Sequence, residues 1–442
     1  MASSAGFPGK SSQESQYGSY MERIKNSWRA VSPRSLTGAP KLCAVAVAAL
    51  FLAGCSLGHA SAQMTAARSA VAPGPRPTTS TVERWGSFFA AGLPNTDTAA
   101  VPVKVTLPGT VAQVGSSNST EYALLTNGRL YAWGLGGQGE LGDGNLVDSP
   151  TRPVRVDFPP GVKIAYIPTD VMPYDTALAV DTKGQAWGWG DDADGELCLG
   201  DNVIRSTPVK LPFSHVTSLA GAADHDLYDA GGTVYACGQN VEGDLGTGNL
   251  SSTTTPVQVE GLNGSTVVKL ITSFANSGAL LSNGQYYDWG YDGHGQLGDG
   301  SLGLSSDVPV RVPLPHRVTQ VALGGSVFTN GQTIAMLSDG SLWSWGDNHG
   351  YQLGSPATAV PQALPMRFAA PKGITYKFLA TGAATSYAIS TTGNVYAWGV
   401  SYEGQAGDGN FRIARVPVLI ARGATQISAT ANNAVINVPG KK

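Results

Sequence analysis

The sequence predicts an all-β fold, a seven-bladed β-propeller of about 51-residue repeats, from three observations. Glycine is abundant, at 57 of 442 residues, charged residues are only 13% of the chain, and no long helical pattern occurs. A Trp-Gly pair or its equivalent recurs at seven positions along the chain. The two ends of the repeated region look like complementary halves of one repeat. The ring is therefore expected to close by pairing of N- and C-terminal strands, which leaves no exposed sheet edge.

The N-terminal segment is predicted to direct export. Residues 1–54 have the pattern of a signal peptide, with a long basic n-region and an apolar run over residues 42–54. This run is too short to span a bilayer as a resident helix. It ends in Leu-Ala-Gly-Cys, which resembles the bacterial lipobox and implies that Cys55 is lipidated. The segment thus predicts a protein anchored by lipid in the bacterial cell envelope.

Two alternatives stay open for this segment. The tripeptide Ala-Ser-Ala that ends at Ala62 suits an ordinary signal peptidase, whose cleavage yields a soluble secreted or periplasmic protein. The length of the basic region also makes Met21 a second candidate for the first residue. Residues 55–81 are rich in Pro, Ser and Thr and are expected to form a flexible tether, with the propeller over residues 82–442.

The charge of the mature chain argues against nucleic acid as a partner. The whole sequence has 28 basic and 31 acidic residues. Removal of the leader before Cys55 takes away six basic and two acidic residues and leaves a net charge of −7. A nucleic-acid binder needs clustered lysine and arginine to displace counterions. The two cysteines outside the leader, Cys198 and Cys237, either form a disulfide or are two small buried side chains.

The repeat is defined first by its tryptophans. The seven positions are 48 to 56 residues apart, with Cys237 at one of them and tryptophan at Trp85, Trp133, Trp189, Trp289, Trp345 and Trp398. A glycine precedes six of these positions by five residues, as a tight hairpin between two strands requires. These glycines are Gly128, Gly184, Gly232, Gly284, Gly340 and Gly393. The flanking residues alternate in the manner of strands.

A second motif follows Trp-Gly after a gap of four residues, as in Gly-Glu-Leu-Gly over residues 139–142. The combined unit, Tyr-Ala-Trp-Gly-x4-Gly-Gln-Leu-Gly, resembles the regulator of chromosome condensation repeat, and the resemblance covers about residues 82–440. It implies a seven-bladed propeller. The chain departs from the repeat at Cys198, Cys237, Tyr351 and Ala406, and these departures are expected to weaken single blades without changing the fold.

The predicted function is non-catalytic binding of an unidentified protein of basic or mixed charge. The four-residue gaps between the two motifs should emerge on one face of the ring, and they contain seven carboxylates, four aromatics and no Lys or Arg. Charge steers encounter and aromatic side chains supply affinity. The candidate binding face is Phe88, Phe89, Asp191, Asp192, Asp194, Glu242, Tyr291, Asp292, Asp347, Tyr402 and Glu403. The competing interpretation is that turns favour Asp for local reasons.

No pattern in the sequence indicates a catalytic, cofactor or metal site. The segment 192–196 alternates oxygen ligands as a calcium loop does, but the repeat itself requires its glycine and no bidentate Glu follows at the proper distance. The histidines lack the spacing of a zinc site, and neither a nucleophile elbow nor a phosphate-binding loop occurs. The chain is therefore expected to have no cofactor, no metal and no enzymatic activity.

Three other functions stay open. One secreted branch of the family that the repeat resembles inhibits β-lactamases by covering the enzyme with aromatic loops, so the resemblance implies an inhibitor as one alternative. A purely structural, adhesin-like or envelope scaffold is the second alternative, and an envelope enzyme acting on glycan or peptide is the third. It would need carboxylates such as Asp191, Asp292 and Asp347 to converge.

Overall fold

The structure is a computed structural model, and it describes residues 81–87, 98–117, 120–168, 175–262, 264–326, 329–355, 359–430 and 433–440. The predicted signal peptide, Cys55 and the tether up to residue 80 lie outside these ranges. The described residues include no helix that is long and apolar enough to cross a membrane.

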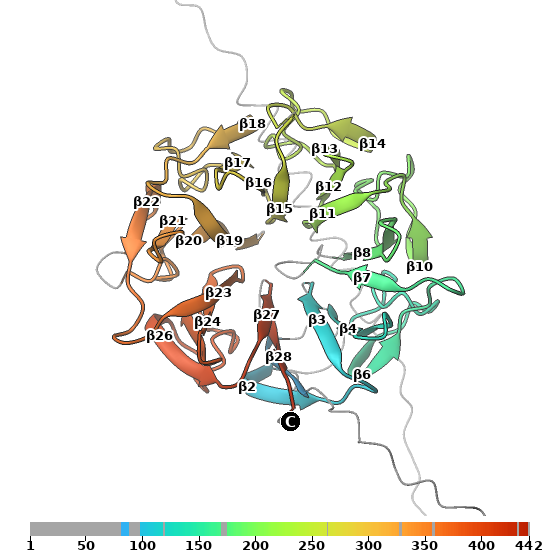
Figure 1. Cartoon of the computed structure of the whole chain (residues 1–442), viewed down its shortest axis with the longest axis horizontal. Helices are drawn as coiled ribbons and strands as arrows, with labels where there is room; N and C mark the ends of the chain where they lie inside the picture. Colours follow the sequence, from blue (N-terminus) through green and yellow to red (C-terminus); the bar gives the residue numbers. More distant parts are fainter. Residues whose placement is uncertain are drawn as a thin grey trace, which may run out of the picture. The chain divides into compact units, whose positions relative to one another are not determined.

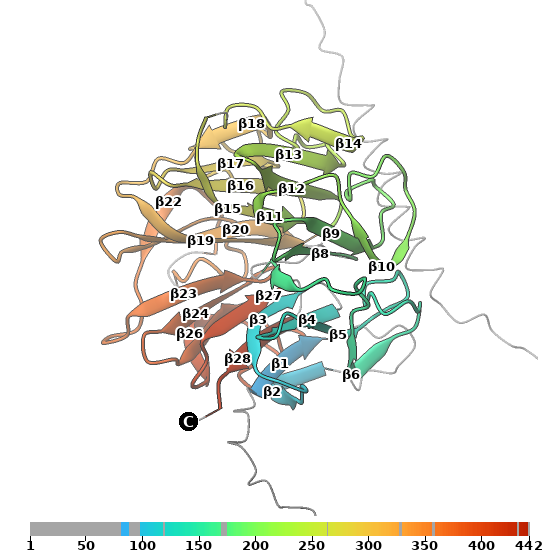
Figure 2. The same cartoon turned by 45° about the vertical axis from the view of Figure 1, so that its right-hand side comes forward.

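Seven four-stranded antiparallel sheets stand around a central axis in the compact unit Pro77–Lys442, so the predicted seven-bladed propeller is confirmed (Figures 1 and 2). We number the blades 1 to 7 along the chain and letter the strands of each blade a to d from the axis outward. Blade 1 contains strands β3–β6, and each following blade contains the next four strands up to blade 6. Blade 7 is built from both ends of the chain.

Most strands have five to seven residues, and the a strands vary most, from three residues in β7 to nine in β19. The a strands are β3 (Val111–Ser116), β7 (Ile164–Tyr166), β11 (Val216–Gly221), β15 (Val267–Thr272), β19 (Val318–Ser326), β23 (Tyr376–Thr381) and β27 (Gln426–Ala429). The b strands are β4 (Thr120–Leu125), β8 (Thr176–Asp181), β12 (His225–Ala230), β16 (Asn276–Leu281), β20 (Thr329–Leu337), β24 (Thr385–Ser390) and β28 (Asn433–Val438). The c strands are β5 (Leu130–Gly134), β9 (Ala186–Gly190), β13 (Thr233–Gly238), β17 (Tyr286–Gly290), β21 (Leu342–Gly346), β25 (Val395–Gly399) and β1 (Thr81–Ser87). The d strands are β6 (Ser149–Arg155), β10 (Arg205–Lys210), β14 (Thr253–Gln258), β18 (Ser306–Arg311), β22 (Gln362–Phe368), β26 (Ala414–Ala421) and β2 (Thr98–Val105).

Blade 7 closes the ring as predicted. Its strand order is β2-β1-β28-β27, so the chain's first two described strands supply strands c and d, and its last two supply strands a and b. Strand β1 pairs with β28 from Thr81 opposite Val438 to Gly86 opposite Asn433. The predicted pairing of N- and C-terminal strands is therefore confirmed, and the ring has no open edge between blades 6 and 1.

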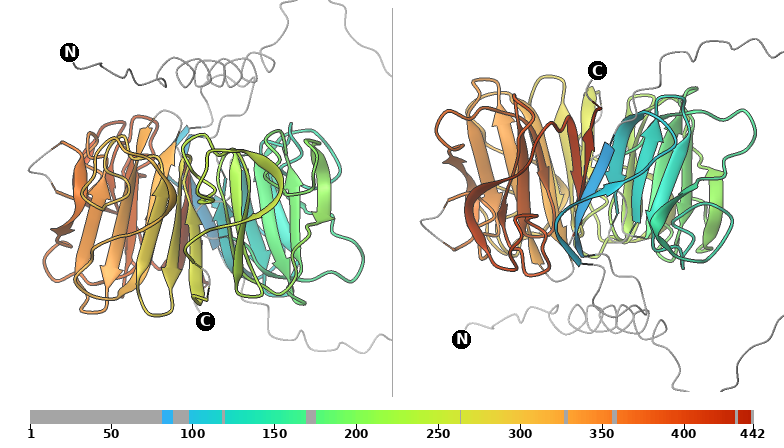
Figure 3. Two further views of the ribbon diagram at one scale, coloured as in Figure 1. Left: turned by 90° about the horizontal axis from the view of Figure 1, so that it is seen from above. Right: turned by 90° about the horizontal axis from the view of Figure 1, so that it is seen from below.

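The ring has two faces, and Figure 3 shows it edge-on with the strands running between them. The c-d face carries the loops that join strand c to strand d and strand a to strand b. The b-c face carries the tight b-c hairpins and the connections from strand d to the next blade. At the predicted hairpin glycines φ lies between 77° and 84°, a region that glycine enters without steric cost.

Adjacent blades are held together by the repeated tryptophans. Each indole is fully buried, and in five of the contacts between blades its Nε1 donates a hydrogen bond to a carbonyl of the preceding blade's second motif. Trp189 donates to the carbonyl of Glu140 at 2.8 Å, and Trp85 closes the ring by donating to the carbonyl of Gln405 at 2.7 Å. The last glycine of the motif packs against the tryptophan side chain of the next blade, since a Cβ at Gly142 would come within 2.7 Å of the Trp189 indole nitrogen.

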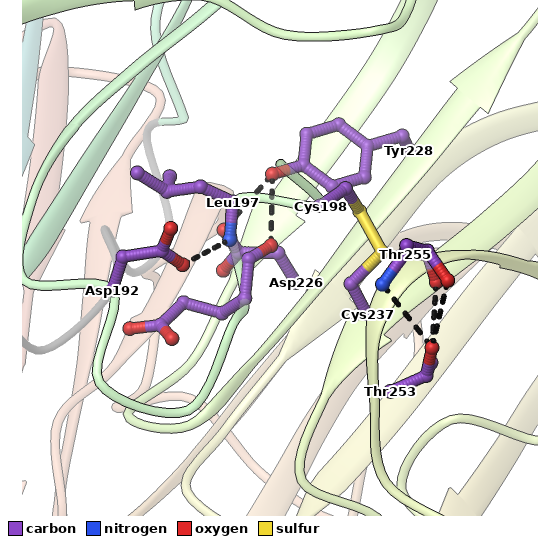
Figure 4. Close-up of a disulfide and its surroundings, with 9 residues drawn as sticks. Asp192, Leu197, Cys198, Asp226, Tyr228, Cys237, Thr253 and Thr255 are labelled. Carbon is purple, nitrogen blue, oxygen red and sulfur yellow. Dashed lines mark hydrogen bonds between the residues drawn. A yellow bond between two sulfur atoms is a disulfide. The ribbon is translucent and has the colours of Figure 1, made fainter. Parts of the chain in front are cut away.

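A disulfide replaces this contact between blades 2 and 3 (Figure 4). Cys237 stands where the tryptophan is expected, and Cys198 stands where the glycine is expected, at a φ of 61° that a non-glycine residue rarely adopts. Their Cα atoms are 5.4 Å apart. The two departures from the repeat are thus one paired exchange, in which a covalent bond takes the place of an indole packed on a glycine.

Loss of the disulfide is expected to destabilise the propeller. Placing the tryptophan and the glycine of the other repeats at positions 237 and 198 is expected to restore much of the lost stability. Cys237→Ser removes a link across 39 residues, which costs about 4 kcal/mol if the bond acts on unfolded-chain entropy. The double variant Cys198→Gly/Cys237→Trp should recover about half or more of that stability, measured by urea unfolding. Cys237→Trp alone should be worse than Cys237→Ser, since the indole would meet the Cβ of Cys198. Equal stability of the two tryptophan variants would refute this account of the exchange.

Candidate protein-binding face

The four-residue gaps lie on the c-d face, and their second position is a structural cap. In blade 2 the Asp192 carboxylate accepts a hydrogen bond from the backbone N–H of Leu197 at 2.9 Å. The same bond, from the residue five positions later, recurs at Asn240, Asp292, Asn348 and Ser401. Asp, Asn and Ser are interchangeable here because each offers an oxygen that can hold the turn.

A second side chain completes the turn from within the motif. The carboxylate of Glu140 accepts a hydrogen bond from the backbone N–H of Gln138, and Asp244 and Gln296 accept one from the residue two positions earlier in the same way. The backbone carbonyls of these motif residues receive the tryptophans of the next blade. The turn and the contact between blades are therefore one unit, which fixes the loops of the c-d face.

Three of the predicted binding residues are buried. Asp192 and Asp292 have no exposed surface, and Asp347 is 4% exposed. Each is bound within its own loop, Asp292 to Leu297 and Ser301, and Asp347 to the Gln352 amide. Their expected place on an exposed surface is therefore corrected. The sequence could not distinguish a capping Asp from an exposed one, since both stand in the same gap.

Three other predicted carboxylates are half-buried and link neighbouring blades. The Gln138 side-chain amide donates to Asp191 at 3.3 Å, and the Gln239 amide donates to Asp194 at 2.7 Å. Glu242 accepts a hydrogen bond from the Ser305 hydroxyl at 2.8 Å. Partial removal from water raises the pKa of Asp191 and of Glu242 above their ordinary values. These residues contribute both to the contacts between blades and to the charge of the face.

The remaining predicted residues differ in exposure. Tyr402 is 62% exposed, whereas Tyr291 and Glu403 are half-buried. Phe88 and Phe89 lie outside the described residues. Binding through these side chains stays a prediction.

A ring of exposed apolar side chains on the c-d loops was not predicted. We call it the apolar rim, and it consists of Leu146, Val147, Val203, Ile204, Leu250, Leu302, Leu304, Val360 and Phe411. These side chains are 40% to 70% exposed, and each of blades 1 to 6 supplies at least one. The signal in the sequence was a bulky apolar residue that recurs shortly after the second motif, among residues typical of turns.

The backbone that carries the rim is fixed across the blade contacts. In blade 1 the N–H of Gly144 donates to the Ser206 carbonyl of blade 2 at 2.9 Å, two residues before Leu146. The equivalent bonds of Gly248 and Gly300 precede Leu250 and Leu302. The rim is therefore displayed by rigid loops, and a partner that binds it loses little free energy in ordering them.

The described residues contain no group of three or more side chains suited to hold a metal ion. The carboxylates that an enzyme of the envelope would need come from three different blades. Asp191 belongs to blade 2, Asp292 to blade 4 and Asp347 to blade 5, and each is hydrogen-bonded within or beside its own loop.

Four stretches of the chain, residues 127–168, 231–273, 283–328 and 339–389, match the regulator of chromosome condensation (RCC1) repeat. The chain is 28% identical over 277 residues to the ultraviolet-B receptor UVR8 of Arabidopsis thaliana, and the match covers 61% of each protein, less than two thirds of the receptor. Among solved structures, human WBSCR16 superposes with a TM-score of 0.71 at 18% identity, over 82% of this chain and 100% of that one. Prp20p of Saccharomyces cerevisiae gives 0.70 at 22% identity, over 83% and 92%. The chain is thus a seven-bladed propeller that carries repeats of the regulator of chromosome condensation type.

Proposed function

We propose that the propeller is a non-catalytic protein-binding module that takes its partner on the c-d face. The observation that carries the proposal is the apolar rim, because exposed large apolar side chains that gather on one face mark interaction sites. Prp20p of Saccharomyces cerevisiae binds Gsp1p and histones, so a propeller of similar fold serves as a protein-binding platform in that case.

The charge between the rim residues favours a basic or mixed partner. Half-buried carboxylates outnumber arginines on the c-d loops, and they include Asp143, Asp148, Asp191, Asp194, Asp201, Glu242, Asp299, Glu403 and Asp408. Several of them also hold the rim in place, as Asp143 does by accepting the N–H of Asn145. An apolar contact surrounded by acidic groups is suited to a protein surface that offers apolar residues among lysines and arginines.

The proposal includes display of this face at the cell envelope through a lipid on Cys55. It is supported by the apolar run over residues 42–54 and the Leu-Ala-Gly-Cys sequence that ends it. The residues that follow, up to β1, are long enough to let the ring reach a partner beyond the membrane surface.

Replacing four rim residues is expected to weaken partner binding at least about tenfold. The rim variant is Leu146→Ser, Leu250→Ser, Leu302→Ser and Phe411→Ser, and each change removes apolar area that a partner would bury. A partner is first captured from envelope extract by Pro77–Lys442, and its Kd is then measured with both proteins pure.

The control replaces four apolar residues that are similarly exposed but lie on d strands at the outside of the ring: Val103→Ser, Leu364→Ser, Val416→Ser and Leu419→Ser. This control should bind as the wild type does. If the two variants bind equally well, the c-d face is not the binding site. If the propeller chemically changes a purified partner, the module is an enzyme and the proposal is wrong.

A further inference from the structure

The two faces of the ring carry opposite charge. Most lysine and arginine side chains among the described residues are exposed at the b-c face, and they are Lys104, Arg129, Arg155, Lys163, Lys183, Lys210, Arg311, Arg317, Arg367, Lys372, Lys377 and Arg422. The exposed or half-buried acidic residues described there are fewer, namely Glu83, Asp157, Glu260 and Asp339. The b-c face is therefore basic although the mature chain has a net charge of −7, because most exposed carboxylates lie at the c-d face.

The position of these cations follows from the topology. Strand d of each blade ends at the b-c face, and Arg155, Lys210, Arg311 and Arg367 lie at or next to such ends. Other cations stand on the connections between blades, close to the b-c hairpin of the blade that the connection leaves. A Cβ at Gly128 would lie 3.0 Å from the Cβ of Lys163, and one at Gly284 would lie 2.5 Å from the Cβ of Arg317.

An aromatic ring lies directly across the sheet from four of the cations. Arg155 pairs with Tyr131, Lys210 with Trp187, Arg311 with Tyr287 and Arg367 with Trp343. The Lys210 ammonium is 5.8 Å from the centre of the Trp187 ring.

Two shallow grooves open beside these pairs. Arg311 and Trp343 line the first groove, and Arg367 and Lys372 line the second. Trp187 is buried, whereas Tyr131, Tyr287 and Trp343 are half-buried. Cations next to such half-buried rings are typical of surfaces that contact the headgroup region of a membrane.

The distribution of the cations fits a plane better than a rod. Every blade except blade 3 supplies at least one of them, so they surround the axis. A nucleic-acid duplex laid on the ring would meet only a stripe of this face, whereas a flat anionic surface would meet all of it. The preceding chain also joins the ring here, since β1 begins at Thr81 opposite Val438 at the b-c face. Cys55, the proposed site of the lipid, therefore precedes a strand that enters the ring from its basic side.

We propose that the b-c face rests on a membrane that contains anionic phospholipid, which leaves the c-d face pointing away from the bilayer. Each cation near such a surface gains from the negative potential, and the gain is lost at high salt. The inference concerns the face opposite to the proposed partner site, so the two can fail separately.

The test is co-sedimentation of Pro77–Lys442, which contains all seven sheets and no part of the leader, with lipid vesicles. The protein is expected to bind phosphatidylcholine vesicles that contain phosphatidylglycerol, to leave them at high salt, and to ignore vesicles of phosphatidylcholine alone. The variant Lys163→Gln/Arg311→Gln/Lys372→Gln should bind about a hundredfold more weakly. The control Arg152→Gln/Arg412→Gln/Arg415→Gln removes the same charge from the other side of the ring and should bind as the wild type does.

Several results would overturn the inference. Absence of binding to the anionic vesicles, or an equal loss in both variants, would show that the b-c face is not a membrane surface. Tighter binding to duplex DNA than to the vesicles, with the same dependence on Lys163, Arg311 and Lys372, would assign the face to nucleic acid instead. Displacement of the protein from the vesicles by inorganic phosphate, at the same concentration as the lipid phosphate, would show that the b-c face is a set of separate phosphate sites.

Discussion

Deletion of residues 428–442 is expected to abolish cooperative folding of the whole propeller. The deletion removes β28 and part of β27, and β28 is the central connection of blade 7, paired with β1 on one side and β27 on the other. Val435 and Ile436 are fully buried, and each contributes about 1.5–3 kcal/mol by burial alone. The exposed edges and the unsupported Trp85 add to this loss, which is large against the about 5–15 kcal/mol that holds a typical domain.

Circular dichroism and thermal unfolding measure the effect. The truncated chain should show no single sharp transition and should bind a hydrophobic dye, whereas a chain that lacks only residues 439–442 should unfold as the wild type does. A truncated chain that keeps a cooperative transition near the wild-type midpoint would show that blades 1 to 6 are stable as an open ring. Ring closure would then have no part in the stability of the fold.

The fold could be predicted because the same sequence motif recurs once in each blade. A single Trp-Gly pair says little, but seven such positions at similar spacing define blades that bury their faces only by stacking. Ring closure was also predictable, since β1 carries the half-repeat that the C-terminal strands lack. What the sequence could not show is which residues are neighbours across two blades. The sequence therefore left open whether Cys198 and Cys237 form a disulfide, and the structure places the two residues opposite each other in neighbouring blades.

The candidate site could be predicted only in part, for two physical reasons. An Asp in a gap is a buried cap at Asp192 and a half-buried side chain at Asp194, and one-dimensional spacing does not separate the two. Net charge, in turn, is a sum over the whole molecule. The basic b-c face becomes visible only when each loop is assigned to one end of its strands, whereas the net charge that disfavours nucleic acid does not show where the charges lie.

The propeller is expected to be most stable at mildly acidic pH because many carboxyl groups are buried between its blades, where desolvation favours their protonated form. Glu196 and Asp226 are both buried in the contact between blades 2 and 3, and the Tyr228 hydroxyl donates to Asp226 at 3.0 Å (Figure 4). Desolvation raises the pKa of both carboxyls well above the ordinary range. It also raises the pKa of Glu140 and of Asp244 to about 8.

The sign of the effect follows from these raised values. Between about pH 4, where an unfolded carboxyl ionises, and about pH 8, the folded protein keeps protons that the unfolded chain has lost. Unfolding then releases protons, so the free energy of unfolding falls as pH rises through this window, by about 1.4 kcal/mol per pH unit for each such group. The unfolding midpoint at pH 5.5 should exceed that at pH 8 by at least about 10 °C.

Asp226→Asn isolates one group from the rest, because an amide keeps an acceptor for Tyr228 and cannot ionise. This variant should be more stable than the wild type at pH 8 and little changed at pH 5.5, which flattens the pH profile. Asp157→Asn, at an exposed position of the b-c face, should keep the wild-type slope. If both variants shift the profile equally, or if the wild-type midpoint rises between pH 5.5 and 8, the buried carboxyls do not set the pH dependence of the ring. If the unfolding midpoint depends less on pH in Asp226→Asn alone, the contact between blades 2 and 3 holds a proton at neutral pH. The ring then tolerates its many buried acidic residues because several of them are uncharged.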